Sequence, residues 1–577
     1  MATIPLGRYL WERIKQVGVS TILGVPGDFN LDLLDHIYDV EGLRWIGNAN
    51  ELNASYATDG YGRVKGVPGV MVTTHGVGEL SALNGVVGAH AEQVKVIHVV
   101  GQTPRLFQEK RMLIHHSIDS DPDHGVYKKM SKPARVAEAE LWDAQKAPAE
   151  IDRVIRECFI QSRPVYIFFP LDIVAEHVPA ERLKTPIDLS LPFEAKSQDT
   201  AIEAITQALG SSKNPALFVD ALTHRHGAQD EARRLADKLK IPIFSSGMGK
   251  GIVDETHECF VGIYSGKVCA PGVGEAIEGS DLVLLLGDIP ADTNAAFSRK
   301  LRPETTIKIN PTDVDVKGKT YANTHIKPLL ARLAETLQPM SVPMPQLPPP
   351  QQDLATIDPA KHITQKWIWP RLASFLQPHD ILIADTGTAS YGLAAVPFPQ
   401  RDVTYITQTY YGSIGYATPC TLGAELARDE LHREQGMPRG RTILVTGDGS
   451  LALTVQEIST MVAVGVKPII FIINNGGYTI ERVIHGAKQP YNAIPPSQYQ
   501  FLLPLFSHPS PESSFWRVST KEEMEKVLED EALRAPDSVK IVEVVMEVMD
   551  APEVLVKLVA SRGPAFEKYL RENGFME

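Results

Sequence analysis

The sequence predicts an α/β fold made of three doubly wound, parallel-sheet domains, and three observations support this prediction. The chain has 577 residues, more than the roughly 250–300 at which a single hydrophobic core stops growing. Short apolar runs alternate with amphipathic helical patterns along the chain, as in successive βαβ units. Six prolines within residues 339–350 predict a stiff spacer before the last domain.

The first domain is expected over residues 1–190, the second over 200–335 and the third over 358–577. Residues 6–17 have the periodicity of an amphipathic helix, and residues 178–200 lose periodicity as a linker does. The expected strands are 21–25, 43–47, 69–74, 95–100 and 164–169 in the first domain, 216–219, 241–244, 282–286 and 306–309 in the second, and 442–446 and 468–473 in the third.

Composition argues against several kinds of partner. A net charge of −13 and a pI of about 5.8 argue against a nucleic-acid-binding protein. No apolar run reaches the roughly 18 residues that span a bilayer, so no membrane partner is expected. The four cysteines lie far apart without a CxxC pair, which favours a reduced, cytoplasmic location.

The most specific motif is Gly447-Asp448-Gly449-Ser450, followed about two dozen residues later by Asn474-Asn475. Both parts follow expected strands of the third domain, at strand ends where ligands bind in open α/β sheets. Asp448 and Asn475 offer the hard oxygens that Mg²⁺ prefers, and Gly449-Ser450 opens a helix whose N–H groups favour phosphate. The motif predicts a magnesium–diphosphate site, although a Gly-Asp-Gly triplet alone is often a plain turn.

Four other polar features stand outside this motif. Asp28 lies at an expected strand-to-helix turn, Glu51 follows the 43–47 strand, and Glu481 lies just beyond the motif. His115 and His116 are adjacent. Each has a structural alternative when taken singly: a helix cap, a surface carboxylate or a pair of loop histidines.

Long blocks of the sequence resemble the fungal-type pyruvate decarboxylase family of thiamin diphosphate-dependent 2-oxo acid decarboxylases. The blocks include PGDFN (26–30), NANELNASYATDGYGR (48–63), GVGELSALNG (76–85), GSIGY (412–416), GDGSLALTVQEIST (447–460) and GYTIERVIHG (477–486). The resemblance implies a pyrimidine-binding, a central and a diphosphate-binding domain. It also implies a homodimer at minimum, with a homotetramer, a dimer of dimers, common in the family, and with the cofactor between domains of two chains.

The resemblance implies non-oxidative decarboxylation of a 2-oxo acid, pyruvate by default, to an aldehyde and CO₂ with thiamin diphosphate and Mg²⁺. In the family pattern the carboxylate of Glu51 hydrogen-bonds the cofactor's aminopyrimidine. The residues that would orient the substrate and relay protons are Asp28, His115, His116 and Glu481. The implied Mg²⁺ ligands are Asp448, Asn475 and the carbonyl of Gly477. The implied cofactor contacts are Glu51, Thr386, Gly387, Thr388, Gly412, Ser413, Ile414, Asp448, Gly449, Ser450, Asn475, Gly477, Tyr478, Thr479 and Ile480.

The sequence departs from the family at several positions. Leu222 and Phe159 stand where several fungal members carry a regulatory cysteine and a tyrosine, so substrate activation by that route is not expected. Ser390 leaves an acyl pocket without a bulky aromatic. Three further departures near the chemistry are His75, Gly476 and Pro419-Cys420.

Three alternatives stay open from the sequence. The same chemistry could act on phenylpyruvate, indolepyruvate or a branched-chain oxo acid. An acetohydroxyacid-synthase-like carboligase would share Glu51 and the magnesium motif, but not the histidine pair with Glu481. A binding or assembly protein on this fold would be expected to lack at least one cofactor residue, and none is missing.

Overall fold

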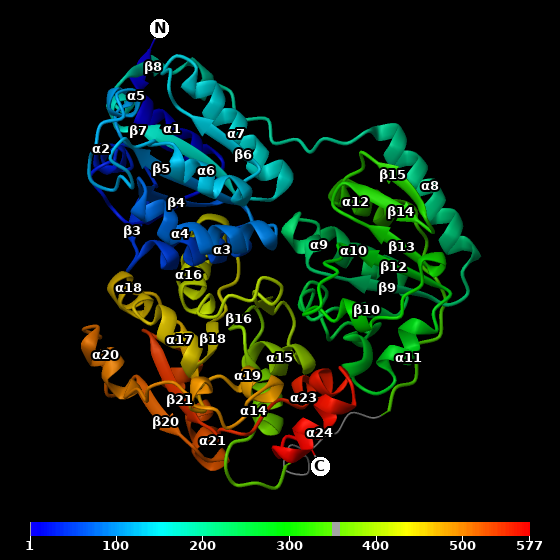
Figure 1. Ribbon diagram of the computed structural model, residues 1–577. Coiled ribbons are helices and arrows are strands. Elements are labelled where there is room, and N and C mark those ends of the chain that lie inside the picture. The colour runs from blue at the N-terminus through cyan, green and yellow to red at the C-terminus, as the bar shows by residue number, and fades with distance from the viewer. Residues whose placement is uncertain (1, 349–357, 577) are drawn as a thin grey trace. The chain divides into compact units, whose positions relative to one another are not determined.

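The computed structural model describes residues 2–348 and 358–576 (Figure 1). The chain packs as two compact units, which are described separately. The first unit holds residues 1–190, 418–439 and 454–466, and the second holds 191–417, 440–453 and 467–577. Residues 339–348 of the expected proline spacer are in neither helix nor strand, and residues 349–350 lie outside the described residues.

A six-stranded parallel sheet forms the core of the first unit. Its order is β3-β2-β4-β5-β7-β6, so the direction of winding reverses between β2 and β4. Every residue of β4, β5 and β7 is buried, because helices cover both faces of such a sheet. The strands are β2 (Thr21–Gly24), β3 (Arg44–Gly47), β4 (Gly69–Thr74), β5 (Val96–Gln102), β6 (Ala137–Glu140) and β7 (Val165–Pro170).

Helices α3 and α4 pack against β4, and α7 packs against β6 and β7. The expected linker over 178–200 is shorter than predicted, because β8 (His177–Pro179) pairs with β1 (Thr3–Pro5) and α8 begins at Ala195. The helices of this unit are α1 (Leu6–Gln16), α2 (Leu31–Asp35), α3 (Glu51–Lys65), α4 (Val77–Ala91), α5 (Arg105–Glu109), α6 (Val126–Ser131), α7 (Ala147–Gln161), α16 (Ala417–Gln435) and α18 (Glu457–Val464).

Helices α3 and α16 approach each other closely within the first unit. A Cβ atom on Gly60 would lie 2.3 Å from the carbonyl oxygen of Cys420, and one on Gly423 would lie 1.8 Å from that of Ala57. Only glycine allows such an approach between backbones. Pro419 lies in the first turn of α16, where a missing N–H costs nothing. The Pro419-Cys420 departure therefore lies at a helix start packed on α3.

The C-terminal part of the second unit has a parallel sheet with the same topology. Its order, β17-β16-β18-β19-β21-β20, repeats the relative strand order of the first sheet. The strands are β16 (Ile381–Ala384), β17 (Thr404–Ile406), β18 (Thr442–Gly447), β19 (Ile469–Asn474), β20 (Phe515–Val518) and β21 (Lys540–Val545). The helices are α14 (Gln365–Phe375), α15 (Thr388–Ala395), α17 (Asp448–Thr454), α19 (Thr479–Ile484), α20 (Leu502–Leu505), α21 (Lys521–Glu529), α22 (Glu531–Arg534), α23 (Glu553–Ala560) and α24 (Pro564–Glu572).

The central part of the second unit has a seven-stranded sheet, β11-β10-β9-β12-β13-β14-β15. Its first five strands are parallel and doubly wound, and β14 and β15 add an antiparallel hairpin that the sequence did not predict. The elements are α8 (Ala195–Ser211), β9 (Pro215–Val219), α9 (Leu222–Arg225), α10 (Gln229–Leu239), β10 (Ile243–Ser245), β11 (Phe260–Ile263), α11 (Val273–Glu278), β12 (Leu282–Leu286), β13 (Thr306–Ile309), β14 (Asp313–Val316), β15 (Lys319–Ala322) and α12 (Ile326–Thr336).

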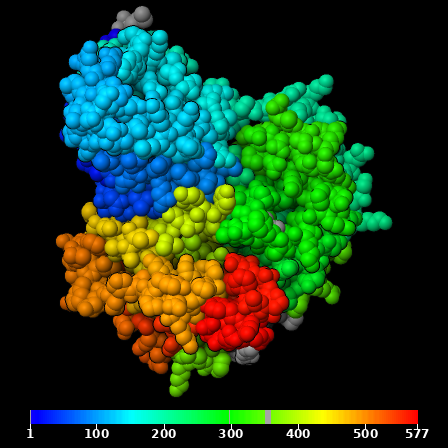
Figure 2. Space-filling model, viewed as in Figure 1, coloured from blue at the N-terminus to red at the C-terminus, as the bar shows by residue number. Residues whose placement is uncertain are grey.

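The predicted class, three α/β domains with doubly wound parallel sheets, is confirmed. Leu222 begins α9 and packs with Met248 and Ile289 in a small apolar cluster. None of the helices in the described ranges is both long and apolar enough to cross a bilayer. The last helices, α23 and α24, lie against α19 in the second unit, seen in red beside orange in Figure 2.

Candidate active site

Polar residues of the first unit gather at the carboxyl edge of its sheet. Asp28 lies between β2 and α2, Glu51 begins α3 just after β3, and His75 follows β4. In a parallel sheet these strand ends share one edge, beside the reversal of winding between β2 and β4. The sheet therefore brings together side chains that lie far apart in the sequence.

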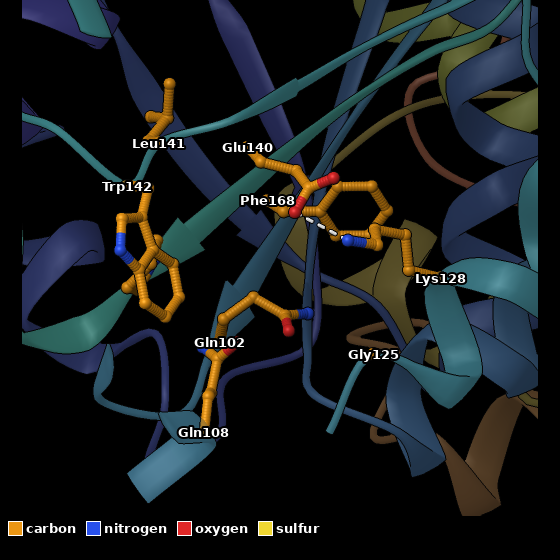
Figure 3. A pocket seen from close by; sticks show the side chains of 9 residues that line it. Gln102, Gln108, Gly125, Lys128, Glu140, Leu141, Trp142 and Phe168 are labelled. Atoms are coloured by element: carbon orange, nitrogen blue, oxygen red, sulfur yellow. Dashed lines mark ion pairs between the residues drawn. The ribbon is translucent and has the colours of Figure 1, made fainter. Parts of the chain in front are cut away.

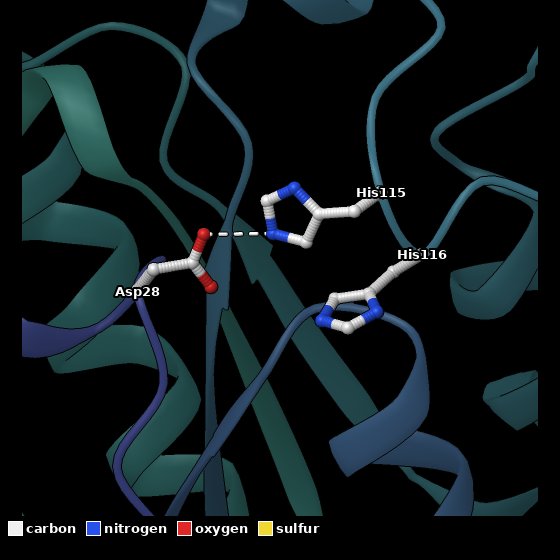
Figure 4. Close-up of side chains that lie close together, drawn as sticks. All are labelled: Asp28, His115 and His116. Carbon is white, nitrogen blue, oxygen red and sulfur yellow. Dashed lines mark ion pairs between the residues drawn. The ribbon is translucent and has the colours of Figure 1, made fainter.

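Asp28, His115 and His116 form a cluster at this edge (Figure 4). His115 Nε2 lies 2.7 Å from Asp28 Oδ2, and the two imidazole rings lie 4.6 Å apart between centroids. The side chains of His115 and Asp28 are 56% and 54% exposed, so the cluster is open to a ligand. A carboxylate beside two imidazoles can bind a carboxylic acid substrate and transfer protons to or from it.

Glu51 is half-buried at the first position of α3, where the Asn50 side chain caps the helix by accepting from Asn53 N at 2.8 Å. A Cβ atom on Gly78 would lie 3.1 Å from Glu51 Oε1, so Gly78 keeps space beside the carboxylate. A carboxyl group beside such a space can accept a hydrogen bond from a flat heterocycle when ionised, and can donate one to it when protonated. The surroundings of Glu51 therefore fit the aminopyrimidine of thiamin diphosphate.

Glu457 holds the turn that precedes Glu51, and sequence reasoning missed it. This fully buried carboxylate accepts from Asn48 Nδ2 at 2.7 Å and from Ala49 N at 3.4 Å. Burial raises the pKa of Glu457. The available signal was the acidic residue in the apolar stretch 451–464, which pattern reasoning treats as one helical face.

The second unit places the magnesium–diphosphate motif at the carboxyl ends of β18 and β19. Asp448 is 1% exposed and accepts from the N–H groups of Gly449, Gly476 and Gly477 at 2.7, 2.7 and 3.1 Å. Burial raises the pKa of the Asp448 carboxyl. A buried carboxylate held by neutral donors fits a cation, because a divalent ion would offset the cost of burying its charge.

Asn475 and Gly477 complete a set of hard oxygen donors. The amide of Asn475 donates from Nδ2 to Thr479 Oγ1 at 2.7 Å, which leaves Oδ1 as its oxygen donor. Gly477 has φ of 128°, and a Cβ atom there would lie 2.2 Å from the carbonyl oxygen of Asn492. A Cβ atom on Gly449 would lie 2.6 Å from the ring of Tyr478. Glycine is therefore required at both positions, Gly477 against Asn492 and Gly449 against Tyr478. The donor set fits Mg²⁺.

Thr386, Gly387 and Thr388 follow β16 at the same edge. Asp385, just before them, is 1% exposed and accepts from Thr446 Oγ1 at 2.8 Å and from Gly415 N at 3.2 Å. Burial raises the pKa of Asp385 to about 7. Asp385 therefore ties the 385–388 turn to the 412–415 loop, and a carboxylate ending the apolar run 381–384 was its sequence signal.

The loop with Gly412, Ser413 and Ile414 is fixed by Gln408. The Gln408 carbonyl accepts from Gly412 N at 2.8 Å, and its side-chain oxygen accepts from Ser413 N at 3.3 Å. Gln408 is fully buried, Ile414 is half-buried, and Gly412 has φ of 70°. Sequence reasoning missed Gln408, because nothing local distinguishes a buried amide from a surface one.

Glu481 is exposed in the first turn of α19, and Ile480 and Ile484 of this helix pack against the cluster formed by α23 and α24. Ser390 is buried, and its hydroxyl bonds Gly387 at the start of α15 (Oγ to the Gly387 carbonyl, 3.0 Å). The hydroxyl of Ser390 therefore holds the start of α15.

The structure also contains two cavities in the first unit that hold none of the predicted site residues. One has a volume of about 20 Å³, room for one water, and lies beside Gln102, Trp142 and the Lys128–Glu140 ion pair (Figure 3). The other, of about 480 Å³, is lined by Arg13, Asp152 and neighbouring residues. Arg13 is already paired with Asp152, at 2.8 Å.

Comparison with known proteins gives the class to which this fold and site belong. Three thiamine pyrophosphate enzyme models match the chain: the N-terminal TPP binding domain over residues 4–124, the central domain over 202–340 and the C-terminal TPP binding domain over 385–544. The chain therefore has the domains of a thiamin diphosphate enzyme, and the two groups of predicted site residues lie one in each TPP binding domain.

The relatives narrow this class. The chain is 44% identical over 565 residues to the pyruvate decarboxylase of Kluyveromyces lactis, covering 96% of this chain and 98% of the relative. Pyruvate decarboxylase isozyme 1 of Saccharomyces cerevisiae is 42% identical with the same coverage. The Candida glabrata pyruvate decarboxylase is 42% identical over 571 residues, 97% of this chain and 99% of the relative. The chain belongs to the pyruvate decarboxylase family of thiamin diphosphate-dependent decarboxylases.

Proposed function

We propose that this protein decarboxylates pyruvate to acetaldehyde and CO₂ without oxidation, using thiamin diphosphate and Mg²⁺. The observation that carries the proposal is the pairing of two site halves within one chain. The first holds a carboxylate with two histidines, and the second holds a buried Asp448 among hard oxygen donors. When bound, thiamin diphosphate supplies the nucleophilic carbon and the electron sink that decarboxylation requires.

The diphosphate half anchors the cofactor. Asp448, Asn475 and the Gly477 carbonyl would hold Mg²⁺, and the N–H groups of Gly449 and Ser450 would hold the diphosphate. The residues that would contact the rest of the cofactor are Thr386, Gly387, Thr388, Gly412, Ser413, Ile414, Tyr478, Thr479 and Ile480. Support comes from the close packing of Gly449 against the Tyr478 ring and from the hydrogen bond of Gly477 N to Asp448, which hold the 447–450 and 475–479 loops together.

The acid–base half moves protons. Glu51 would hold a proton at the ring nitrogen of the aminopyrimidine, beside the space that Gly78 keeps. Asp28, His115 and His116 would orient the substrate carboxylate and return a proton to the carbon that loses CO₂, together with Glu481. The 2.7 Å contact between His115 and Asp28 supports this, because a carboxylate fixes the orientation of the imidazole it pairs with.

Several further features belong to the proposal. The three domains would span residues 1–190, 200–335 and 358–577. A complete site would combine the acid–base half of one chain with the diphosphate half of another, in a homodimer that pairs into a homotetramer. A cytoplasmic location is supported by four free cysteines, three of them buried.

The test is a substrate panel with purified protein, thiamin diphosphate and Mg²⁺, following CO₂ and aldehyde. We expect the highest kcat/KM on pyruvate, with lower values on phenylpyruvate, indolepyruvate and branched-chain oxo acids. A preference for one of those would reassign the substrate and keep the reaction. Release of acetolactate in place of aldehyde would indicate a carboligase, and turnover of no 2-oxo acid would refute the proposal.

A further inference from the structure

The loop that carries His115 and His116 lacks regular structure of its own. It runs from residue 110 to residue 125, between α5 and α6, and most side chains over 110–121 are exposed. His116 has φ of 67°, a conformation that is unfavourable for a residue with a side chain. Within the segment, Ser117 N donates to the Ile114 carbonyl at 3.2 Å, and the exposed Arg111 pairs with the exposed Asp121 at 2.7 Å. Because exposed ion pairs contribute little, contacts from outside the 110–121 segment are needed to hold this conformation.

Two side chains that follow this segment provide such contacts. The Tyr127 hydroxyl donates to the backbone carbonyl of His116. His124 Nε2 lies 3.0 Å from the backbone carbonyl of Met112, and His124 Nδ1 lies 2.9 Å from Thr103 Oγ1. Because a carbonyl only accepts, Nε2 carries the hydrogen and Nδ1 accepts from the threonine hydroxyl. The two bonds therefore fix the backbone on either side of His115.

The residues that make these contacts are themselves held firmly. Tyr127 and His124 are 3% and 4% exposed, in contrast to the segment they hold. A Cβ atom on Gly76 would lie 2.9 Å from the Tyr127 ring, and the rings of His75 and Tyr127 are nearly perpendicular, with centroids 5.2 Å apart. Because a buried hydroxyl or imidazole needs a partner, these two groups and the segment's carbonyls depend on one another.

Phe29 links the buried ring of His75 to the imidazole of His115. Its ring stacks on His115 with centroids 5.0 Å apart and an interplanar angle of 12°. It also meets His75 edge to face at 6.0 Å. Tyr127, His124 and Phe29 thus contact both the backbone of the loop and one of its histidine rings. The folding of α6 alone would not require contacts to the histidine ring.

We propose that Tyr127 and His124 are positioning residues that hold the His115–His116 segment in its working conformation through hydrogen bonds to the carbonyls of His116 and Met112. This inference rests on the proposed proton-transfer role of the two histidines. A reacting group displaced by about 1 Å can lose on the order of 100-fold in rate. Tyr127 and His124 act through the loop and do not touch the substrate.

The first test compares Tyr127→Phe with Tyr166→Phe in the holoenzyme. Tyr166 is fully buried in β7, and its hydroxyl has no hydrogen-bond partner among the described residues. We expect Tyr127→Phe to lower kcat about 10-fold, the value of one hydrogen bond, with thiamin diphosphate affinity unchanged. Amide hydrogen exchange over residues 110–117 should become faster in this variant, and Tyr166→Phe should change neither property.

The second test uses two conservative variants of His124 that keep different halves of its contacts. Glutamine places its amide near the Nε2 position and can still donate to the Met112 carbonyl. Asparagine reaches only the Nδ1 position beside Thr103. We expect His124→Gln to retain most of the wild-type kcat and slow exchange over 110–117, and His124→Asn to lose both.

Wild-type kcat and exchange in Tyr127→Phe would overturn the inference, as would equal losses in Tyr127→Phe and Tyr166→Phe. Equal behaviour of the two His124 variants would also overturn it for that residue. The exchange measurement separates this inference from the proposed function. If the wild-type protein decarboxylated no 2-oxo acid, the proposed function would fail, and exchange over 110–117 would still decide whether the loop is held.

Discussion

At the scale of single residues, the carboxylates of the site have contrasting surroundings. Asp448 is 1% exposed and bound by three backbone N–H groups, whereas the side chain of Asp28 is 54% exposed beside His115. Burial makes the charge of Asp448 costly unless a cation offsets it. Asp448 is therefore suited to hold a metal, and Asp28 is suited to exchange protons with a substrate.

Asp448→Asn should weaken Mg²⁺-dependent binding of thiamin diphosphate. Removing the charge deletes a metal ligand, and even changes outside the ligand shell of a metal cost about 10- to 100-fold in affinity. Calorimetric titration of the cofactor at several Mg²⁺ concentrations would measure the loss. Asp230→Asn, at an exposed position of α10, is the control that should bind normally. Unchanged cofactor affinity in Asp448→Asn would contradict the assigned metal site.

Glu51→Gln should bind the cofactor but turn over slowly. The amide keeps the shape and one hydrogen bond but cannot hold or release the proton, and loss of such a group typically costs about 10²- to 10⁴-fold. Steady-state kcat and cofactor titration would be measured together. Glu41→Gln, at an exposed position before β3, should match the wild type. Near-normal kcat in Glu51→Gln would refute the role given to this carboxylate.

At the scale of elements, the start of α4 concentrates buried polar groups beneath the histidine loop. Gly76 caps the helix with φ of 69°, and its N–H donates to Glu79 Oε1 at 3.1 Å. Glu79 is 1% exposed, and burial raises its pKa to about 7. Burial also lowers the pKa of His75 to about 4. At this helix start, burial therefore favours the neutral forms of both Glu79 and His75.

Glu79→Gln should make stability less dependent on pH. The unfolded chain releases the Glu79 proton above its ordinary pKa of 4.5, while the folded chain keeps it to about 7. The free energy of unfolding of the wild type therefore falls across this window, by at most about 3 kcal/mol for this group. His75 acts in the opposite direction between about 4 and 6.5 in both proteins, so their comparison isolates Glu79.

Urea unfolding midpoints at pH 5 and pH 7.5 would measure this difference. The glutamine variant should lose less stability than the wild type between the two pH values. Glutamine keeps an oxygen for the Gly76 N–H, so the helix cap is preserved. A pH dependence equal to that of the wild type would show that Glu79 ionises as easily when folded as when unfolded.

At the scale of the whole molecule, the two halves of the site belong to different packing units of one chain. Asp28, Glu51, His115 and His116 lie in the first unit, and the magnesium motif with Glu481 lies in the second. The two parallel sheets that carry these residues have the same relative strand order. In each sheet, the predicted site residues follow the carboxyl ends of the strands. In the proposed dimer, the first-unit residues of one chain would complete the site with the second-unit residues of the other.

Mixing two inactive variants tests that arrangement. Glu51→Gln and Glu481→Gln would be unfolded, combined and refolded into mixed dimers. If each site takes Glu51 from one chain and Glu481 from the other, a mixed dimer contains one unaltered site and part of the activity returns. Variants refolded separately are the control. Failure of the mixture to regain activity, with mixed dimers shown by mass, would place both residues of each site in one chain.

Much of the site could be predicted from the sequence because it follows strand ends. Asp28, Glu51, Asp448 and Asn475 each lie close after a buried run, and the local pattern places such residues at the carboxyl edge of a parallel sheet. Strand β6 (AEAE) and the hairpin β14–β15 escaped prediction because they are polar and lack a buried apolar run. Strands β16 and β21 were also not among the expected strands, although both are buried, mostly apolar runs that the same pattern could have predicted.

The sequence by itself determined the α/β class, because apolar periodicity encodes it, and it singled out the Gly-Asp-Gly and Asn-Asn motif as a short pattern at two strand ends. The roles expected of Asp28, Glu51, His115, His116 and Glu481 came from the resemblance of long sequence blocks to a known family. Tertiary structure alone decided that Glu457 holds the turn before Glu51, that Asp385 joins two cofactor loops, and that Tyr127 and His124 hold the histidine loop. Each of these contacts joins segments through a buried side chain. Burial and hydrogen bonding depend on which elements pack together, and a local pattern of residues does not encode that.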